Sequence, residues 1–133
     1  MKETAAREAM VRLAKSLFDR GYSVGSSGNI SMAVEDGLLI TPTNSCLGFL
    51  DPARISKLDV QGRHVGGDLP SKEVFLHQAF YDTRPGTGAV VHLHSTYATM
   101  VSCHADTDPS DGIRRHQTRP VRGDHPDLSS RGP

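Results

Sequence analysis

Two histidines separated by one residue, His92 and His94, have the side-chain types and spacing that best suit metal chemistry in this sequence. They end a β-branched, alternating run over residues 88–94 that is typical of a strand. Because successive side chains of a strand point to opposite faces, both imidazoles would share one face, with Val91 and Leu93 on the other. The pair predicts a two-ligand metal platform, although a polar strand end alone would show the same pattern.

A carboxylate that could join this platform, Glu73, stands two residues after Ser71 at the predicted start of a helix running to about Tyr81. Serine is a preferred N-cap, and the unpaired N–H groups of a helix N-terminus stabilise anions. The segment therefore suits a phosphate or carboxylate ligand, and a plain N-cap with an acidic first turn is the alternative. Four apolar residues would face the core: Val74, Phe75, Ala79 and Phe80.

Two polar turns add further candidate ligand donors. Gly28-Asn29 follows the Ser-rich residues 24–27, and Thr43 lies in the run Thr41-Pro42-Thr43-Asn44-Ser45. Backbone and hydroxyl donors in such turns can cradle a phosphate without a lysine. Ordinary turn chemistry explains each segment equally well when it is taken singly.

The elements that position these side chains begin with an opening helix and a hairpin. The helix, which Gly21 can end, is predicted by apolar residues three to four positions apart: Ala6, Met10, Leu13, Ala14 and Leu17. Strand-like runs over residues 29–33 and 38–41 flank Glu35-Asp36-Gly37, and an Asp-Gly pair suits a tight turn.

The rest of the chain continues the alternation of helix and strand. Asp51-Pro52 predicts a short helical turn, followed by a strand over residues 57–60, a loop over 62–70 and a helix over 96–103. Alternating elements indicate an α/β or α+β fold, in which helices cover a sheet.

Composition limits the class of partner. The 133 residues carry no net formal charge, and residues 1–18 lack the continuous apolar run of a signal peptide. We therefore expect one cytoplasmic domain without a general nucleic-acid or membrane surface. Cys46 and Cys103 lie far apart, outside any paired-cysteine motif, and are expected to be reduced thiols.

The end of the chain differs from the rest in composition. Residues 1–113 hold ten basic and thirteen acidic groups, whereas residues 114–133 hold five and two, with Val121 and Leu128 as their sizeable apolar residues. Such a segment cannot bury enough surface to offset its ordering entropy, so we expect a disordered basic tail. An alternative hypothesis is a frameshift near codon 113 of a GC-rich gene, which sequencing of that gene would test.

Four segments together resemble the class II aldolase/adducin family over approximately residues 5–113: Gly28-Asn29-Ile30-Ser31, Thr41-Pro42-Thr43, Pro70-Ser71-Lys72-Glu73 and Val91-His92-Leu93-His94-Ser95. The last two are most similar to the branch of 3-oxo-tetronate 4-phosphate decarboxylases. Fuculose-phosphate aldolases and ribulose-phosphate epimerases are neighbouring branches. The resemblance implies α/β/α layers with a mixed central sheet, and a lyase of carbohydrate metabolism.

The resemblance also implies roles for individual residues. His92, His94 and Glu73 would bind a divalent metal, with zinc as the preferred ion. Glu73 would also be the acid/base. The phosphate of the sugar acid would be held by Gly28, Asn29, Thr43 and Ser71. Lys72 stands where the aldolase branch carries a small hydroxyl residue, and our hypothesis is that it pairs with the substrate carboxylate. The implied reaction is decarboxylation through a metal-stabilised enediolate, because a divalent metal acts as a Lewis acid. The family is typically homotetrameric, with active sites shared between subunits.

The sequence departs from the family at its end. Family members supply a third metal-binding histidine downstream, whereas the remaining His104, His116 and His125 follow a predicted helix or lie in the tail. Asn44 stands where related aldolases carry Gly. We therefore expect a C-terminally truncated domain with an incomplete sheet. The alternatives to a decarboxylase are a sugar-phosphate aldolase or epimerase, a catalytically inactive remnant, and a structural subunit of the adducin kind.

Overall fold

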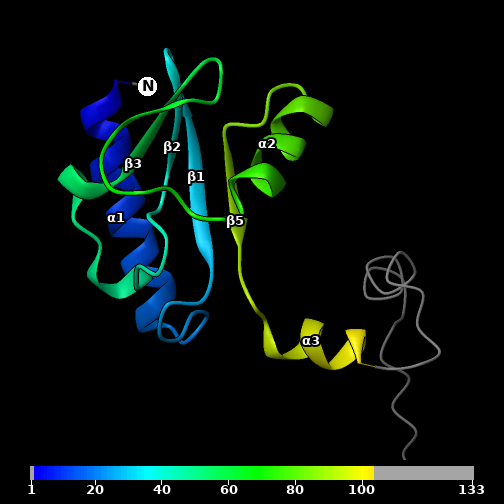
Figure 1. The fold of residues 1–133 in the computed structure, drawn as a ribbon. Helices are drawn as coiled ribbons and strands as arrows, with labels where there is room; N and C mark the ends of the chain where they lie inside the picture. The colour runs from blue at the N-terminus through cyan, green and yellow to red at the C-terminus, as the bar shows by residue number, and fades with distance from the viewer. Residues whose placement is uncertain (1, 104–133) are drawn as a thin grey trace, which may run out of the picture. The chain divides into compact units, whose positions relative to one another are not determined.

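Helices and strands alternate along the chain in the computed structural model, which describes residues 2–103 (Figure 1). The elements up to Ser95 are α1 (Glu3–Asp19), β1 (Asn29–Val34), β2 (Gly37–Ile40), η1 (Leu47–Phe49), η2 (Pro52–Arg54), β3 (Ser56–Asp59), β4 (His64–Gly66), α2 (Val74–Thr83) and β5 (Ala89–His92). The helix α3 (Thr96–Ser102) begins a second unit and forms where the sequence predicts it.

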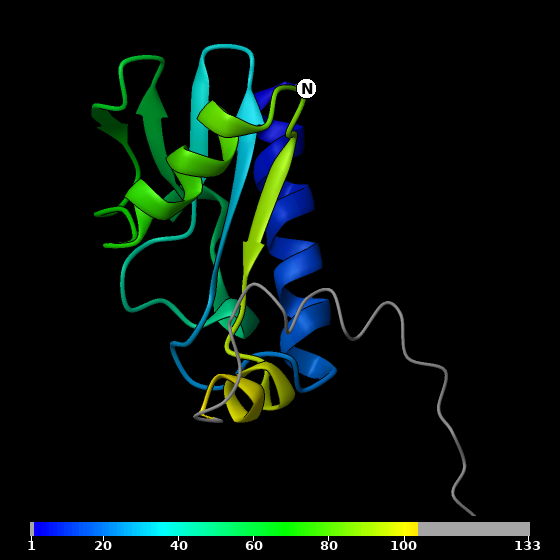
Figure 2. The same cartoon turned by 90° about the vertical axis from the view of Figure 1, so that its right-hand side faces the viewer.

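Five strands form one sheet in the order β4-β3-β2-β1-β5, and α1 and α2 cover its opposite faces (Figures 1 and 2). Side chains alternate across a strand, so β1 can serve both helices. Ile30 and Met32 pack on the side of α1, whereas Ser31 bonds to His77 of α2. The predicted α/β/α layering is confirmed. All pairings within residues 2–103 are antiparallel, so the parallel part of the expected mixed sheet is not among them.

The opening helix α1 buries one stripe of side chains against the sheet. Ala6, Met10 and Ala14 are fully buried at a spacing of four residues. Gly21 follows the helix with φ at 77°, the left-handed conformation that the sequence predicts. Leu13, expected in the stripe, is instead 53% exposed. It lies about 60° around the helix from Met10 and therefore at the margin of the stripe.

The predicted hairpin and helical turn are present. β1 and β2 pair antiparallel from Ser31 opposite Ile40 to Val34 opposite Gly37. Asp51 caps η2, because its carboxylate accepts a hydrogen bond of 2.9 Å from the Ala53 amide. The strand predicted at residues 57–60 is β3 and begins one residue earlier.

Two expectations for the middle of the chain are wrong. Residues 62–70, expected to be a loop, contain β4, whose exposed His-Val-Gly sequence carries no apolar alternation to reveal it. The helix expected from Ser71 begins at Val74. Its sheet-facing side also differs from the apolar set predicted, because Phe75 is 69% exposed and His77 is fully buried.

The structure describes the two cysteines and the lengths of the helices, but it does not describe the tail. Cys46 and Cys103 are free thiols, as expected. Within the described range, no helix has both the length and the apolar content that crossing a membrane requires. The tail predicted at residues 114–133 and the histidines at positions 104, 116 and 125 lie outside the described residues, and their assignment stays a prediction.

The buried stripe of α1 predicts an unequal response to truncation. Met10→Ala empties a fully buried position and is expected to lower the free energy of unfolding by about 2–4 kcal/mol. Leu13→Ala on the same helix is the matched control and is expected to cost less than about 1 kcal/mol, because half of that side chain is exposed. Urea unfolding followed by circular dichroism measures both, and equal losses would contradict the packing described.

Candidate metal centre

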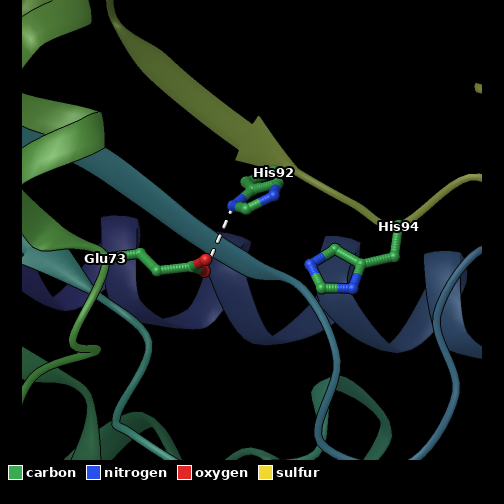
Figure 3. Close-up of side chains that lie close together, drawn as sticks. All are labelled: Glu73, His92 and His94. Carbon is green, nitrogen blue, oxygen red and sulfur yellow. Dashed lines mark ion pairs between the residues drawn. The ribbon is translucent and has the colours of Figure 1, made fainter. Parts of the chain in front are cut away.

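Three candidate metal ligands converge where β5 ends, and their side chains point toward one another (Figure 3). Glu73 immediately precedes α2, His92 is the last residue of β5, and His94 lies two residues further on. Their candidate ligand atoms all lie within 4.8 Å of one another. His92 Nδ1 is 3.2 Å from Glu73 Oε2, and the two imidazole centroids are 5.1 Å apart. The structure thus brings together the three residues predicted from sequence.

The spacing of these atoms fits one shared metal ion. Zinc binds imidazole nitrogen and carboxylate oxygen at roughly 2.0–2.2 Å, so two ligands of a tetrahedral site lie about 3.4 Å apart. The separation of 3.2 Å between His92 Nδ1 and Glu73 Oε2 is close to that value. Two imidazoles and one carboxylate are also a donor set that zinc accepts, and further positions stay open.

The buried Nδ1 atom of His92 supports the same interpretation. This nitrogen is shielded from solvent and makes no hydrogen bond within residues 2–103, although the Glu73 carboxylate is near. A buried polar atom without a partner costs free energy, so such atoms are rare unless a ligand or ion binds them. A metal ion between His92 and Glu73 would remove that cost.

Glu73 is held through both its backbone and its side chain. Its amide donates to Ser71 Oγ at 3.3 Å, and its Oε2 accepts a hydrogen bond from the Asn29 side-chain amide. The Asn29 bond is the main reason that the pKa of Glu73 lies below its ordinary value; burial opposes the shift, and His92 adds to it. The ionised carboxylate that results is the form that binds a cation.

The position of Glu73 differs from the one expected. It is the N-cap residue of α2, with φ at −91° and ψ at 12°, and not a residue of the first turn. Ser71 therefore orients the backbone of Glu73 ahead of the helix instead of capping the helix itself. This offset turns the carboxylate toward β1 and β5, where Asn29 and His92 meet it.

Two residues beside the site were not predicted from the sequence. His77 is fully buried and bonds to Asn29 Oδ1 through Nε2 and to Ser31 Oγ through Nδ1, the latter at 2.7 Å. Tyr81, one helical turn further, bonds to Ser31 Oγ at 2.9 Å. The signal was present, because Glu73, His77 and Tyr81 recur every four residues and so share one side of the helix.

The residues predicted to hold a phosphate lie in different settings. Asn29 and Ser71 are buried, at 6% and 7% exposure, and both polar atoms of the Asn29 side chain are already engaged. Thr43 is partly buried, and its amide donates to the Leu69 carbonyl at 2.9 Å. Lys72 is exposed. A single open phosphate cradle is therefore not evident from these side chains.

Two turn positions place constraints on the backbone around the site. Gly28 has φ at 79°, and a Cβ there would lie 2.9 Å from the His92 carbonyl oxygen and 3.1 Å from the Leu93 side chain. Asn44 has φ at 55°, a left-handed conformation that asparagine tolerates and glycine adopts freely. The turn at Asn44 therefore keeps a backbone that either residue can form.

Known proteins resemble this chain over most of its length. The model for the Class II Aldolase and Adducin N-terminal domain matches residues 8–129. A curated 3-oxo-tetronate 4-phosphate decarboxylase from Escherichia coli (strain K12) is 53% identical over 113 residues, which cover 84% of this chain and 53% of that protein. An L-fuculose phosphate aldolase from Methanococcus vannielii is 40% identical over 92 residues, which cover 69% of this chain and 50% of the aldolase.

Solved structures share the fold. The crystal structure of YgbL from Klebsiella pneumoniae superposes with a TM-score of 0.77 at 48% identity, covering 82% of this chain and 53% of YgbL. An L-fuculose-1-phosphate aldolase from Thermus thermophilus superposes with a TM-score of 0.63 at 29% identity, covering 76% of this chain and 52% of the aldolase. The present chain spans about half the length of the curated relatives it matches.

The contact between Gly28 and β5 predicts a substitution effect. Gly28→Ala adds a methyl group against the His92 carbonyl in a left-handed backbone, and we expect the free energy of unfolding to fall by about 2–3 kcal/mol. Gly25→Ala is the matched control, because its φ is also left-handed at 55° but nothing lies within 4 Å, and about 1 kcal/mol is expected. Urea unfolding of both variants measures the difference, and similar values would show that the contact is not tight.

Proposed function

Since this chain belongs to the class II aldolase and adducin family, we propose that it carries the metal-binding part of a carbon–carbon lyase that decarboxylates a 3-oxo-tetronate 4-phosphate. The observation that carries the proposal is the convergence of Glu73, His92 and His94 within 4.8 Å. The decarboxylases among the relatives are more similar to this chain than the fuculose-phosphate aldolases are, which favours decarboxylation over aldol cleavage.

The chemistry of the reaction explains why these residue types are needed. When the carboxylate carbon leaves a 3-oxo acid as carbon dioxide, the bonding electron pair stays on the neighbouring carbon, C2, and one proton must then reach C2. A divalent cation, when bound, would stabilise the developing negative charge as a Lewis acid. His92, His94 and Glu73 would hold that cation, and zinc is the ion that their donor set fits.

Glu73 would also handle the proton. Its Oε2 is bonded to the Asn29 amide, so its other oxygen, Oε1, is the one that can face a substrate. As a positioned carboxylate within hydrogen-bond reach of the reacting atom, Glu73 would take a proton from solvent water and pass it to the carbon that carbon dioxide has left. Asn29 would then serve the site through Glu73 rather than by contact with a phosphate.

The polar turns around the candidate metal centre would bind the charged ends of the substrate. We propose that Gly28, Thr43 and Ser71 border the phosphate, with Asn29 behind them. Lys72 is exposed next to Glu73 and would pair with the substrate carboxylate. A homotetramer in the cytoplasm belongs to the same proposal and follows from the family resemblance alone.

The metal-binding part of the proposal is tested by zinc content. The purified full chain is expected to hold about one zinc per chain, and the double variant His92→Ala/His94→Ala to hold less than about a tenth of that, because only Glu73 remains of the donor set. His64→Ala, which removes an exposed histidine of β4, is the matched control and should leave the zinc content unchanged. Elemental analysis after gel filtration gives the result. Zinc that survives in the double variant would overturn the site.

The reaction itself is tested by product analysis with the zinc-loaded chain. Release of carbon dioxide from 3-oxo-tetronate 4-phosphate, without cleavage of fuculose 1-phosphate, supports the decarboxylase. Cleavage of fuculose 1-phosphate alone would move the proposal to the aldolase. If zinc is bound and neither substrate reacts, this chain is not by itself a catalyst.

The proposed role of Lys72 is tested by binding. Lys72→Gln is expected to raise the dissociation constant for 3-oxo-tetronate 4-phosphate about tenfold, the loss of one charge-assisted hydrogen bond. Lys15→Gln, which removes an exposed lysine of α1, should leave affinity unchanged. Isothermal titration calorimetry measures both variants. Unchanged affinity in Lys72→Gln would argue against pairing with the substrate carboxylate.

A further inference from the structure

A continuous row of hydrogen bonds runs from the buried side of α2 to the candidate metal centre. In order, it links Tyr81 to Ser31 at 2.9 Å, Ser31 to His77 Nδ1 at 2.7 Å, His77 Nε2 to Asn29 Oδ1, and Asn29 Nδ2 to Glu73. The five residues come from α2, β1 and the N-cap of α2. Each inner member therefore has two partners, one on either side.

The carboxylate end of this row decides which way the donors point. The Asn29 amide donates through its NH₂ group to Glu73 Oε2, so its carbonyl oxygen faces His77 Nε2. The carbonyl oxygen in turn can only accept, so His77 Nε2 must carry a proton. The reverse orientation of Asn29 would place two acceptor oxygens against each other at Glu73.

The buried imidazole of His77 continues the same direction of hydrogen-bond donation. The His77 ring is fully buried and its nitrogens meet an amide oxygen and a hydroxyl rather than a carboxylate, so the neutral form with one proton is favoured. Because that proton is on Nε2, Nδ1 has a lone pair and accepts from the Ser31 hydroxyl. Ser31 Oγ then has free lone pairs, and the Tyr81 hydroxyl donates to it.

At the Tyr81 end of the row, the hydrogen bond has the same donor direction. Burial raises the pKa of Tyr81, with the Ser31 hydroxyl and the Val90 backbone opposing the shift, so the phenol keeps its proton as a donor. Val90 lies opposite Ser31 in the pairing of β1 with β5. The whole row therefore donates in one direction, from Tyr81 to the carboxylate.

From this we infer that His77, Ser31 and Tyr81 are positioning residues of the metal centre: they fix the orientation of the Asn29 amide and, through it, the carboxylate of Glu73. The inference rests on the proposed role of Glu73 as a metal ligand. None of the three contacts a metal or substrate in this scheme. Their effect reaches the centre through Asn29, in the way that hydrogen-bond partners behind metal ligands tune a metal site.

The first test reads the His77 ring directly in the unmutated, metal-free full chain. Long-range ¹H–¹⁵N spectra at neutral pH distinguish the two neutral tautomers and the doubly protonated ring. A single neutral form with its proton on Nε2 is expected. A proton on Nδ1 alone or an equal mixture of tautomers would overturn the inference, because Nε2 would then lack the proton that Asn29 Oδ1 requires. A charged ring would also overturn it, because Nδ1 could not accept from the Ser31 hydroxyl.

The second test uses a conservative pair of substitutions at the same residue. His77→Leu removes the donor to Asn29 and is expected to weaken zinc binding about tenfold or more. His77→Gln retains an N–H donor near the place of Nε2 and is expected to bind zinc within about threefold of the unmutated chain. Zinc affinity is measured by competition with a chelator, and far-ultraviolet circular dichroism monitors folding. Equal weakening by both folded variants would mean a merely structural role for His77.

A milder variant guards against loss of folding. Tyr81→Phe removes one hydroxyl from a partly buried ring and is expected to leave the His77 proton on Nε2, because Asn29 Oδ1 still requires a donor there, while zinc binding weakens by less than in His77→Leu. Zinc affinity unchanged in Tyr81→Phe would remove Tyr81 from the inference. If the unmutated chain takes up no zinc, the proposed function fails, whereas the His77 tautomer still decides whether the row of donors exists.

Discussion

A buried imidazole needs a partner for each of its ring nitrogens, and this requirement at His77 governs the polar side of the sheet. His77 faces the sheet from α2 in a place where a helix would ordinarily present an apolar residue. Its partners must come from the strand beneath it, and Asn29 and Ser31 meet it from β1. The packing of α2 is therefore specific, because sliding the helix along the sheet would leave a buried donor or acceptor without a partner.

The two sides of β1 have different roles. One side packs in the apolar core, and the other carries the polar residues near the candidate metal centre. On one side, Ile30 packs with the buried stripe of α1 in an apolar core. On the other, Asn29 and Ser31 serve the hydrogen-bonded row that ends at Glu73. Because neighbouring residues of one strand take opposite sides, the apolar core fixes the backbone to which the polar residues are attached. The candidate metal ligands thus depend on the packing of α1.

The sequence could reveal elements and candidate ligands whose signal is local. The periodicity of α1, the Asp-Gly turn of the hairpin and the spacing of His92 and His94 each depend on a few neighbouring residues, and these predictions agree with the structure. The strand β4 could not be found this way, because an exposed strand held by backbone hydrogen bonds needs no apolar alternation. His77 was missed for a related reason, since its burial follows from partners in β1, forty-six and forty-eight residues away.

The place of β5 in the sheet bears on how the protein behaves in concentrated solution. Within residues 2–103, β5 is hydrogen-bonded to β1 alone, and it forms one edge of the sheet. Its sequence, Ala-Val-Val-His, contains none of the lysines or prolines that commonly keep edge strands from joining one another. Within the described residues, its outer main-chain groups are therefore a place where a strand from another chain could pair. A strand added at this edge would lie beside His92, so self-association there would bear directly on the candidate metal centre.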